Sequence, residues 1–281
     1  MATAPTKPAT PVKKESSGAS GTFALLTIPI CIIVGILIFI FILGDPSHYQ
    51  GGDVEKGTPQ DIFGTVHRGG FLVPLIMAFV LMVVVFSIER AIVIGRAAGS
   101  GSVDSFVRKI TSLLSAGNID AANAECDKQK GSVANVVKAG LKKYREMEAD
   151  DHLTVDQKTL AIQKEIEEAT ALEMPMLEQN LTIIATLVSI GTLCGLLGTV
   201  LGMIKAFSTM SAQGAPNTSE LSTDISEALV NTALGITTSA SSIILYNFFT
   251  SKIDKLTYAI DETGFSIVQT FGASHAAARR A

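Results

Sequence analysis

The sequence has 281 residues, of which 47% are hydrophobic, and its mean hydropathy is +0.39. Charged residues make up only 17%, whereas about a quarter is usual for a soluble domain. A net charge of −4, without a basic patch interleaved with aromatic residues, argues against nucleic-acid binding. The apolar residues are gathered in blocks, which indicates membrane spans rather than one large core.

The sequence offers no recognisable catalytic or metal-binding pattern. Cys31 and Cys194 lie in apolar spans and Cys126 lies in a charged region, and none has a CxxC or histidine partner. No Ser/His/Asp set, metal-ligand spacing or phosphate-binding loop is present. The histidines are far apart, at His48, His67, His152 and His275. We therefore expect a protein that is not an enzyme, with no cofactor and no metal ion.

The N-terminal part of the chain predicts a tail followed by a membrane helix. Residues 1–22 are rich in Ala, Pro, Thr and Ser, which is typical of a disordered segment. Residues 23–43 form an unbroken apolar run of 21 residues. A secretory signal is the competing interpretation. The run is longer than a signal core, however, and no small-x-small cleavage site follows it, so we favour an additional N-terminal transmembrane helix.

Three further membrane helices are predicted, over residues 71–93, 179–207 and 223–250, because each contains an uncharged run long enough to cross a bilayer. Residues 44–70 are rich in Gly, Pro and Asp and predict a periplasmic loop. Residues 208–222 predict a second, shorter periplasmic loop.

Residues 94–178 are too charged for a bilayer and predict a cytoplasmic helical domain. Its first three amphipathic helices are expected within residues 102–117, 117–129 and 131–148, with glycines between them. A fourth begins at Thr154, where TVDQ offers a capping box with Gln157. This helix is expected to run into the third span as one long helix, kinked near Pro175. Residues 251–281 predict a cytoplasmic helix and tail, and no segment predicts a strand.

The distribution of Lys and Arg predicts the orientation. The N-terminal tail and the segments after the second and fourth spans are rich in these residues. The loop 45–69 has only Lys56 and Arg68, and residues 206–226 have none. Both termini are therefore expected in the cytoplasm. The predicted fold class is an all-α polytopic inner-membrane protein with four transmembrane helices and long helices that extend into the cytoplasm.

The third span carries a stripe of glycines. Helical spacing places them within about 60° of one another, which allows another helix to approach closely and predicts an interior helix. These helix-packing positions are Gly191, Gly195, Gly198 and Gly202. Thr192 and Thr199 lie seven residues apart and share one line. Each hydroxyl could bond its own i−4 carbonyl, but two aligned hydroxyls also favour a polar lining.

The fourth span is headed by a carboxylate, Glu227, and carries polar residues along the same face. The predicted polar lining consists of Asn231, Thr238, Ser241 and Ser242, flanked by Thr232 and Ser239. One interpretation is that Glu227 only caps the helix at the outer water, where the helix dipole stabilises it. The alternative is that an ionisable group in a membrane marks an ion or proton path. The continuing polar strip favours the path.

Two segments resemble the signatures of the MotA/TolQ/ExbB proton-channel family, most closely its ExbB branch. They are GLLGTVLGMIKAF at 195–207 and ISEALVNTALGI at 225–236, the latter followed by YNFF. The resemblance implies that Thr199, Glu227 and Thr232 belong to a proton path. It also implies a homo-oligomer, a pentamer, around an ExbD-like single-span partner with a membrane aspartate, which drives a TonB-like protein in outer-membrane transport.

The chain departs from the ExbB pattern at its N-terminus, because ExbB commonly has three spans and residues 23–43 add a fourth. MotA has four spans, but its last two carry prolines, and residues 176–250 contain only Pro216. A TolQ-like or gliding-motor-like stator subunit and a non-conducting membrane scaffold therefore stay as alternatives.

Overall fold

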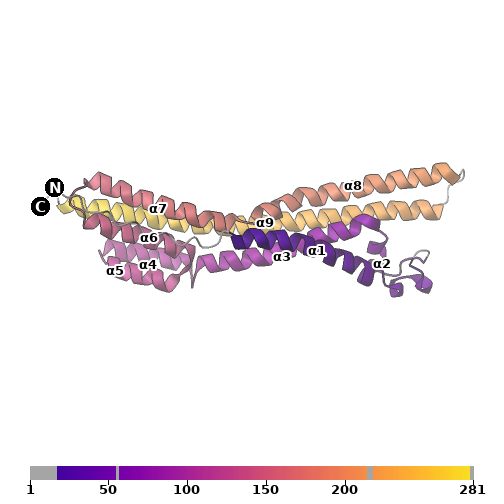
Figure 1. The fold of residues 1–281 in the computed structure, drawn as a ribbon, viewed down its shortest axis with the longest axis horizontal. Helices are drawn as coiled ribbons and strands as arrows, with labels where there is room; N and C mark the ends of the chain where they lie inside the picture. The colour runs from indigo at the N-terminus through magenta and orange to yellow at the C-terminus, as the bar shows by residue number, and fades with distance from the viewer. Residues whose placement is uncertain (1–17, 55–56, 214–217, 279–281) are drawn as a thin grey trace, which may run out of the picture.

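A computed structural model describes residues 18–54, 57–213 and 218–278. Within these ranges the chain is helical apart from short turns, and its one β-type pairing is an isolated bridge between Tyr49 and Pro59. The molecule is elongated, with a bundle of shorter helices at one end and long helices running away from it (Figure 1). The predicted all-α fold class is confirmed.

Four apolar helices are long enough to cross a membrane, as the sequence predicts. They are α1 (Gly18–Leu37, continued by the π-helix η1, Ile38–Leu43), α3 (Val73–Ala98), α8 (Leu181–Gln213) and α9 (Thr218–Ala278). Helix α1 packs on α3, and α8 packs along the first half of α9. The second half of α9 continues without interruption into the bundle, so one helix belongs to both parts of the molecule (Figure 1).

The bundle is built from α4 (Val103–Ser115), α5 (Ile119–Gln129), α6 (Gly131–Glu148), α7 (Val155–Glu178) and the end of α9. Gly117 and Gly131 adopt positive φ between these helices, as expected of glycines that punctuate a helical domain. The capping box predicted at the start of α7 is confirmed, since Thr154 Oγ1 accepts from the Gln157 amide and the Gln157 side chain accepts from the Thr154 amide.

Two predicted boundaries differ from the structure. Helix α1 begins at Gly18 rather than at residue 23, because adding residues to a helix costs little once the apolar run has nucleated it; residues 1–17 of the predicted tail lie outside the described residues. The predicted loop 208–222 is largely helical, since α8 extends to Gln213 and α9 begins at Thr218. Residues 214–217, which contain Gly and Pro, separate the two helices.

The prediction of one continuous helix from residue 154 into the third span is wrong. Helix α7 ends at Glu178, Gln179 is extended, and Asn180 adopts φ +61° before α8 begins at Leu181. Pro175 stays inside α7 and does not mark the break. Asparagine tolerates the left-handed conformation better than most residues, which explains why the chain turns there.

The break is stabilised by Arg90, a side chain from the second span. Its Nη1 donates to the carbonyl oxygens of Met176 at 3.3 Å and Leu177 at 3.2 Å, near the end of α7. A continuing helix would have bonded these two carbonyls four residues further on. Arg90 is only 1% exposed, and its Nε and Nη2 both donate to the carboxylate of the adjacent Glu89. The end of α3 is thereby tied to the end of α7.

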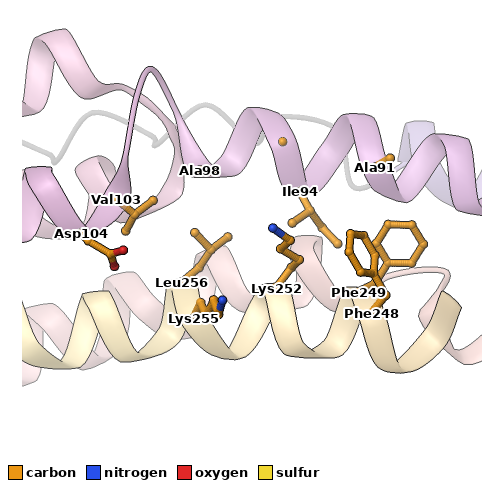
Figure 2. Close-up of a pocket in the computed structure, with 11 residues that line it drawn as sticks. Ala91, Ile94, Ala98, Val103, Asp104, Phe248, Phe249, Lys252, Lys255 and Leu256 are labelled. Atoms are coloured by element: carbon orange, nitrogen blue, oxygen red, sulfur yellow. The ribbon is translucent and has the colours of Figure 1, made fainter. Parts of the chain in front are cut away.

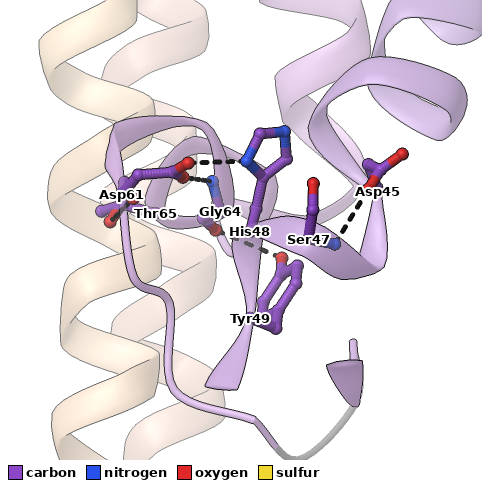
Figure 3. Close-up of polar contacts among 7 residues, drawn as sticks. All are labelled: Asp45, Ser47, His48, Tyr49, Asp61, Gly64 and Thr65. Atoms are coloured by element: carbon purple, nitrogen blue, oxygen red, sulfur yellow. Dashed lines mark hydrogen bonds and ion pairs between the residues drawn. The ribbon is translucent and has the colours of Figure 1, made fainter. Parts of the chain in front are cut away.

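The segment between α1 and α3 folds into a small cap made of η2 (Pro46–His48), η3 (Gln50–Gly52), α2 (Ile62–His67) and η4 (Gly70–Leu72). Asp61 caps α2 by accepting from the Gly64 amide at 2.9 Å, and His48 Nδ1 lies 2.6 Å from its other oxygen (Figure 3). The Gly64 amide is the main reason that the pKa of Asp61 is lowered. The buried Tyr49 hydroxyl lies between Gly64 O and His67 Nδ1.

Replacing Arg90 tests its role at the helix break. Arg90→Gln leaves two carbonyls and the Glu89 carboxylate without their partner, and losing one member of a buried ion pair typically costs roughly 3 kcal/mol or more. We expect a clear drop in the thermal unfolding temperature of the purified protein in detergent. Arg96→Gln, at an exposed position on the same helix, is the matched control. Equal unfolding temperatures for the two variants would contradict the role of Arg90.

Candidate functional site

The glycine stripe of α8 faces α9 of the same chain. A methyl group added to Gly191 would lie 3.1 Å from Gly235 O, and one added to Gly195 would lie 3.2 Å from Asn231 O. One added to Gly198 would overlap Asn231. The stripe is matched on α9 by Gly235, where an added methyl would lie 2.5 Å from Gly191 O. The two backbones therefore touch directly along this line.

Because the backbones are so close, two hydroxyls of α9 reach carbonyls of α8. Thr232 Oγ1 donates to Gly195 O at 3.0 Å, with its own Ala228 O at 3.3 Å as a second acceptor. Ser239 Oγ donates to Val188 O at 2.7 Å, two turns further along. These bonds fix how α9 is rotated and shifted against α8, and so they position every other side chain on its first half.

Glu227 forms an ion pair with α8. Its Oε2 lies 2.9 Å from Lys205 Nζ, and the same ammonium lies 3.0 Å from Asp224 Oδ1. The Glu227 side chain is 17% exposed and that of Lys205 is 56% exposed, so the cluster is near the molecular surface but partly shielded. The carboxylate is therefore neither a simple cap in water nor an isolated buried charge. It is compensated within its own chain.

Lys205 is a functional candidate that the sequence reasoning missed. It is part of the quoted segment GLLGTVLGMIKAF, and it stands just outside residues 206–226, whose lack of basic residues was used to predict orientation. Lys205 lies eight residues before the end of α8 at Gln213, and Glu227 lies nine residues after the start of α9 at Thr218. That nearly equal spacing is the signal that could have paired them.

The same carboxylate rests against the start of α3. A methyl group at Gly70, which has φ +76°, would overlap Glu227 Oε1. Next to it, Asn231 Nδ2 donates to Gly69 O at 2.7 Å and to Glu227 O at 3.1 Å, and Asn231 is only 2% exposed. The two glycines that precede α3 thus allow Glu227 and Asn231 to contact its backbone. The site is built from three spans, α3, α8 and α9.

The remaining residues of the predicted polar lining divide into two groups. Thr238 and Ser242 are buried, and each donates to the carbonyl four residues earlier in its own helix. Ser241 is exposed. On α8, Thr192 donates to Val188 O and Thr199 donates to Leu196 O. These intrahelical bonds satisfy the hydroxyls but leave their oxygens able to accept a further bond.

Helix α8 is not an interior helix of a single chain. Only its glycine face is covered, whereas Leu193, Leu196, Val200 and Ile204 are exposed. Thr199 lines an open hollow on this uncovered side, with Val200 and Met203 among its neighbours. The structure therefore joins Glu227, Asn231 and Thr232 in one contact region and places Thr199 on an uncovered face.

No group of three or more potential metal ligands occurs among the residues that the structure describes. The buried Cys126 in the bundle is unsuited to ligand or redox chemistry at neutral pH, because burial raises the pKa of its thiol to about 12.

Comparison with known proteins identifies the segment that contains this site. Residues 128–262 match the model of the MotA/TolQ/ExbB proton channel family. The match covers just under half of the chain. It includes Lys205, Glu227 and Thr232, together with both helices of the glycine-lined pair.

Individual relatives carry ExbB and TolQ names. The chain is 39% identical over 88 residues to the putative biopolymer transport protein ExbB-like 3 of Synechocystis, and 43% identical over 77 residues to the biopolymer transport protein ExbB of Aquifex aeolicus. These matches cover 31% and 27% of this chain and 42% and 52% of the relatives. The Tol-Pal system protein TolQ of Pseudomonas aeruginosa is 24% identical over 160 residues, which cover 57% of this chain and 69% of TolQ.

The chain thus matches about half the length of the two ExbB-named relatives. Together with the four apolar helices, these matches indicate a multi-pass protein of the bacterial inner membrane.

The glycine contact can be tested by adding one methyl group. Gly198→Ala places a Cβ onto Asn231, and overpacking a close contact typically costs ~1–3 kcal/mol. Gly272→Ala, in the second half of α9, meets no atom within 4 Å and is the control. We expect only Gly198→Ala to lower the unfolding temperature in detergent. A Gly198→Ala protein as stable as the control would show that α8 and α9 do not touch at this point.

Proposed function

We propose that this chain is the proton-channel subunit of an ExbB–ExbD-like motor in the inner membrane, which couples proton-motive force to work on the outer membrane. The observation that carries the proposal is the Lys205–Glu227–Asp224 cluster at the outer end of the α8–α9 pair, with Asn231 and Thr232 directly behind it. The family match supports the channel, and no catalytic group is part of the proposal.

The cluster suits a group that receives protons. Two carboxylates share one ammonium, so the three groups carry a formal charge of −1 when all are ionised. The cluster therefore places a net negative, partly shielded group beside the polar residues of α9. Lys205, which is more exposed, links it to the outer water.

The path from Glu227 is proposed to run inward along the polar residues of α9. Asn231 lies one turn further, and Thr232 is held by its bond to α8. Thr199 lies on an uncovered face, so it joins this path only if another copy of the chain, or a partner, covers that face. A ring of five chains would do so, and the exposed apolar residues of α8 and α9 supply the surface for it. An ExbD-like single-span helix with a membrane aspartate would then occupy the centre.

The identity of the driven machine is part of the proposal. ExbB-named relatives favour coupling through a TonB-like protein to outer-membrane transport. The TolQ relative, which aligns with a larger share of this chain, is the observation that favours the alternative of a TolQ-like stator. Both machines require a proton path, whereas a non-conducting scaffold does not.

Proton flux through the complex tests the proposal. We expect Glu227→Gln and Glu227→Ala to assemble normally and to abolish flux, which in the native complex is driven by ~2.3 kcal/mol per 100 mV. The measurement is proton uptake into liposomes that contain purified chain and its single-span partner, under an imposed potential. Glu168→Gln, an exposed carboxylate on α7, is the control. A proton flux in Glu227→Ala equal to that of the native complex would refute the proposed proton path. Glu227 would then only cap the helix.

Orientation is a separate proposal, with both termini in the cytoplasm and the cap of residues 44–69 outside. In a variant without native cysteines, Ser47→Cys and Ser105→Cys provide one thiol on each side, since residues 47 and 105 are both exposed. An impermeant thiol reagent added to intact spheroplasts should label only Ser47→Cys. Labelling of Ser105→Cys alone would reverse the orientation.

A further inference from the structure

A second cavity lies between the end of α3, the start of α4 and the middle of α9, and its lining includes no residue of the Glu227 cluster (Figures 1 and 2). Its volume is about 460 Å³. The apolar part of its lining consists of Ala91, Ile94, Gly95, Ala98, Val103, Phe248, Phe249 and Leu256. The charged part consists of Asp104, Lys252 and Lys255. The cavity is therefore apolar along most of its wall and cationic on its α9 side.

The two lysines are placed where a membrane helix leaves the bilayer. They follow directly after the uncharged residues 228–250, three residues apart on α9, and both are exposed. Figure 2 shows Lys252 projecting from α9 toward α3. Its Nζ lies 5.6 Å from the centre of the Phe248 ring, an arrangement that holds the ammonium beside the apolar wall.

The α3 side of the cavity lies at a similar depth relative to the membrane as the two lysines of α9. The uncharged part of α3 ends before Glu89, so residues 91–98 lie within about 14 Å of that point along the helix axis. A layer of polar headgroups lies on each side of the hydrocarbon core of a bilayer. The two headgroup layers together add roughly 10–15 Å to the thickness of the core. One leaflet contributes about half of this, roughly 5–8 Å, so the cavity begins at the headgroup level of the leaflet that faces the helical bundle and extends beyond it.

Gly95 keeps the cavity open. A methyl group added to it would meet no atom within 4 Å, although its neighbour Ile94 is buried. The absence of a side chain at this position on α3 leaves room for a chain of methylene groups to lie between α3 and α9. Phe249 and Leu256, both largely buried, close the opposite side.

We propose that this cavity binds one anionic phospholipid, with its phosphate at Lys252 and Lys255 and an acyl chain against the apolar wall beside Gly95. A soluble phosphate would use the lysines but not the wall, and an uncharged lipid would use the wall but not the lysines. Asp104, at the α4 end of the cavity, can accept hydrogen bonds from headgroup hydroxyls, which favours a glycerol headgroup. Phosphatidylglycerol combines all three features.

Lipid binding to the full chain in detergent tests this site by native mass spectrometry, with phosphatidylglycerol, phosphatidylethanolamine and phosphatidylcholine compared at equal concentrations. We expect preferential retention of phosphatidylglycerol. The double variant Lys252→Gln/Lys255→Gln should weaken its apparent affinity about tenfold or more, since each basic residue near a lipid surface contributes about 1 kcal/mol. The control is Lys142→Gln/Lys164→Gln, which removes two exposed lysines of the bundle.

A second variant tests the apolar part without changing charge. Gly95→Leu fills the space beside α3 and should displace the lipid, whereas Gly272→Leu, at an open position near the end of α9, should not. Equal retention of the three lipids, or unchanged retention in the lysine variant, would overturn the proposal. So would a loss of oligomer mass without loss of lipid in Gly95→Leu, because a second copy of the chain would then be the occupant. The readout is lipid mass, so it is independent of proton transport.

Discussion

The direct backbone contact between α8 and α9 is the constraint on which the rest of the structure depends. Lipid tails are as apolar as leucine side chains, so membrane helices gain little from hydrophobic burial against one another and associate through close packing and polar contacts. Glycines on both helices allow that approach, and the bonds from Thr232 and Ser239 to carbonyls of α8 set the register. In this register Lys205 lies opposite Glu227. Larger side chains at the glycine positions would push α8 and α9 apart and separate the Glu227 carboxylate from the Lys205 ammonium.

Helix α3 connects the region around Glu227 to the helical bundle. Just before its first residue, Gly69 and Gly70 admit the side chains of Asn231 and Glu227, and in its second half Arg90 binds the carbonyls of α7. Helix α9 makes the same connection by continuing unbroken from the site into the bundle. Two helices therefore join the region around Glu227 to the bundle. The additional helix α1 packs on α3, on the side of the molecule opposite α8 (Figure 1).

Local patterns predicted most of the fold, because helix spacing and capping depend on near neighbours. The glycine stripe, the Thr154 capping box and the four apolar runs are all of this kind. The features that were missed join distant parts of the chain. Arg90 bonds carbonyls 86 and 87 residues away, and nothing near Asn180 indicates that such a partner will end the helix there. Lys205 is part of a segment that resembles the family, but its pairing with Glu227 depends on how α8 and α9 pack against each other. The resemblance to the family indicated Thr199, whereas in the structure of a single chain this residue lies on an uncovered face of α8.

Glu227 is held as one member of an ion pair within its own chain. A double-mutant cycle measures this directly, using the free energies of unfolding of the native protein, Lys205→Met, Glu227→Gln and the double variant under identical detergent conditions. Residues in direct contact typically show coupling energies of about 0.5–3 kcal/mol. We expect a coupling within that range, with the double variant less destabilised than the sum of the two single variants. Strict additivity of the two single changes would show that Lys205 and Glu227 do not interact and would rule out the ion pair.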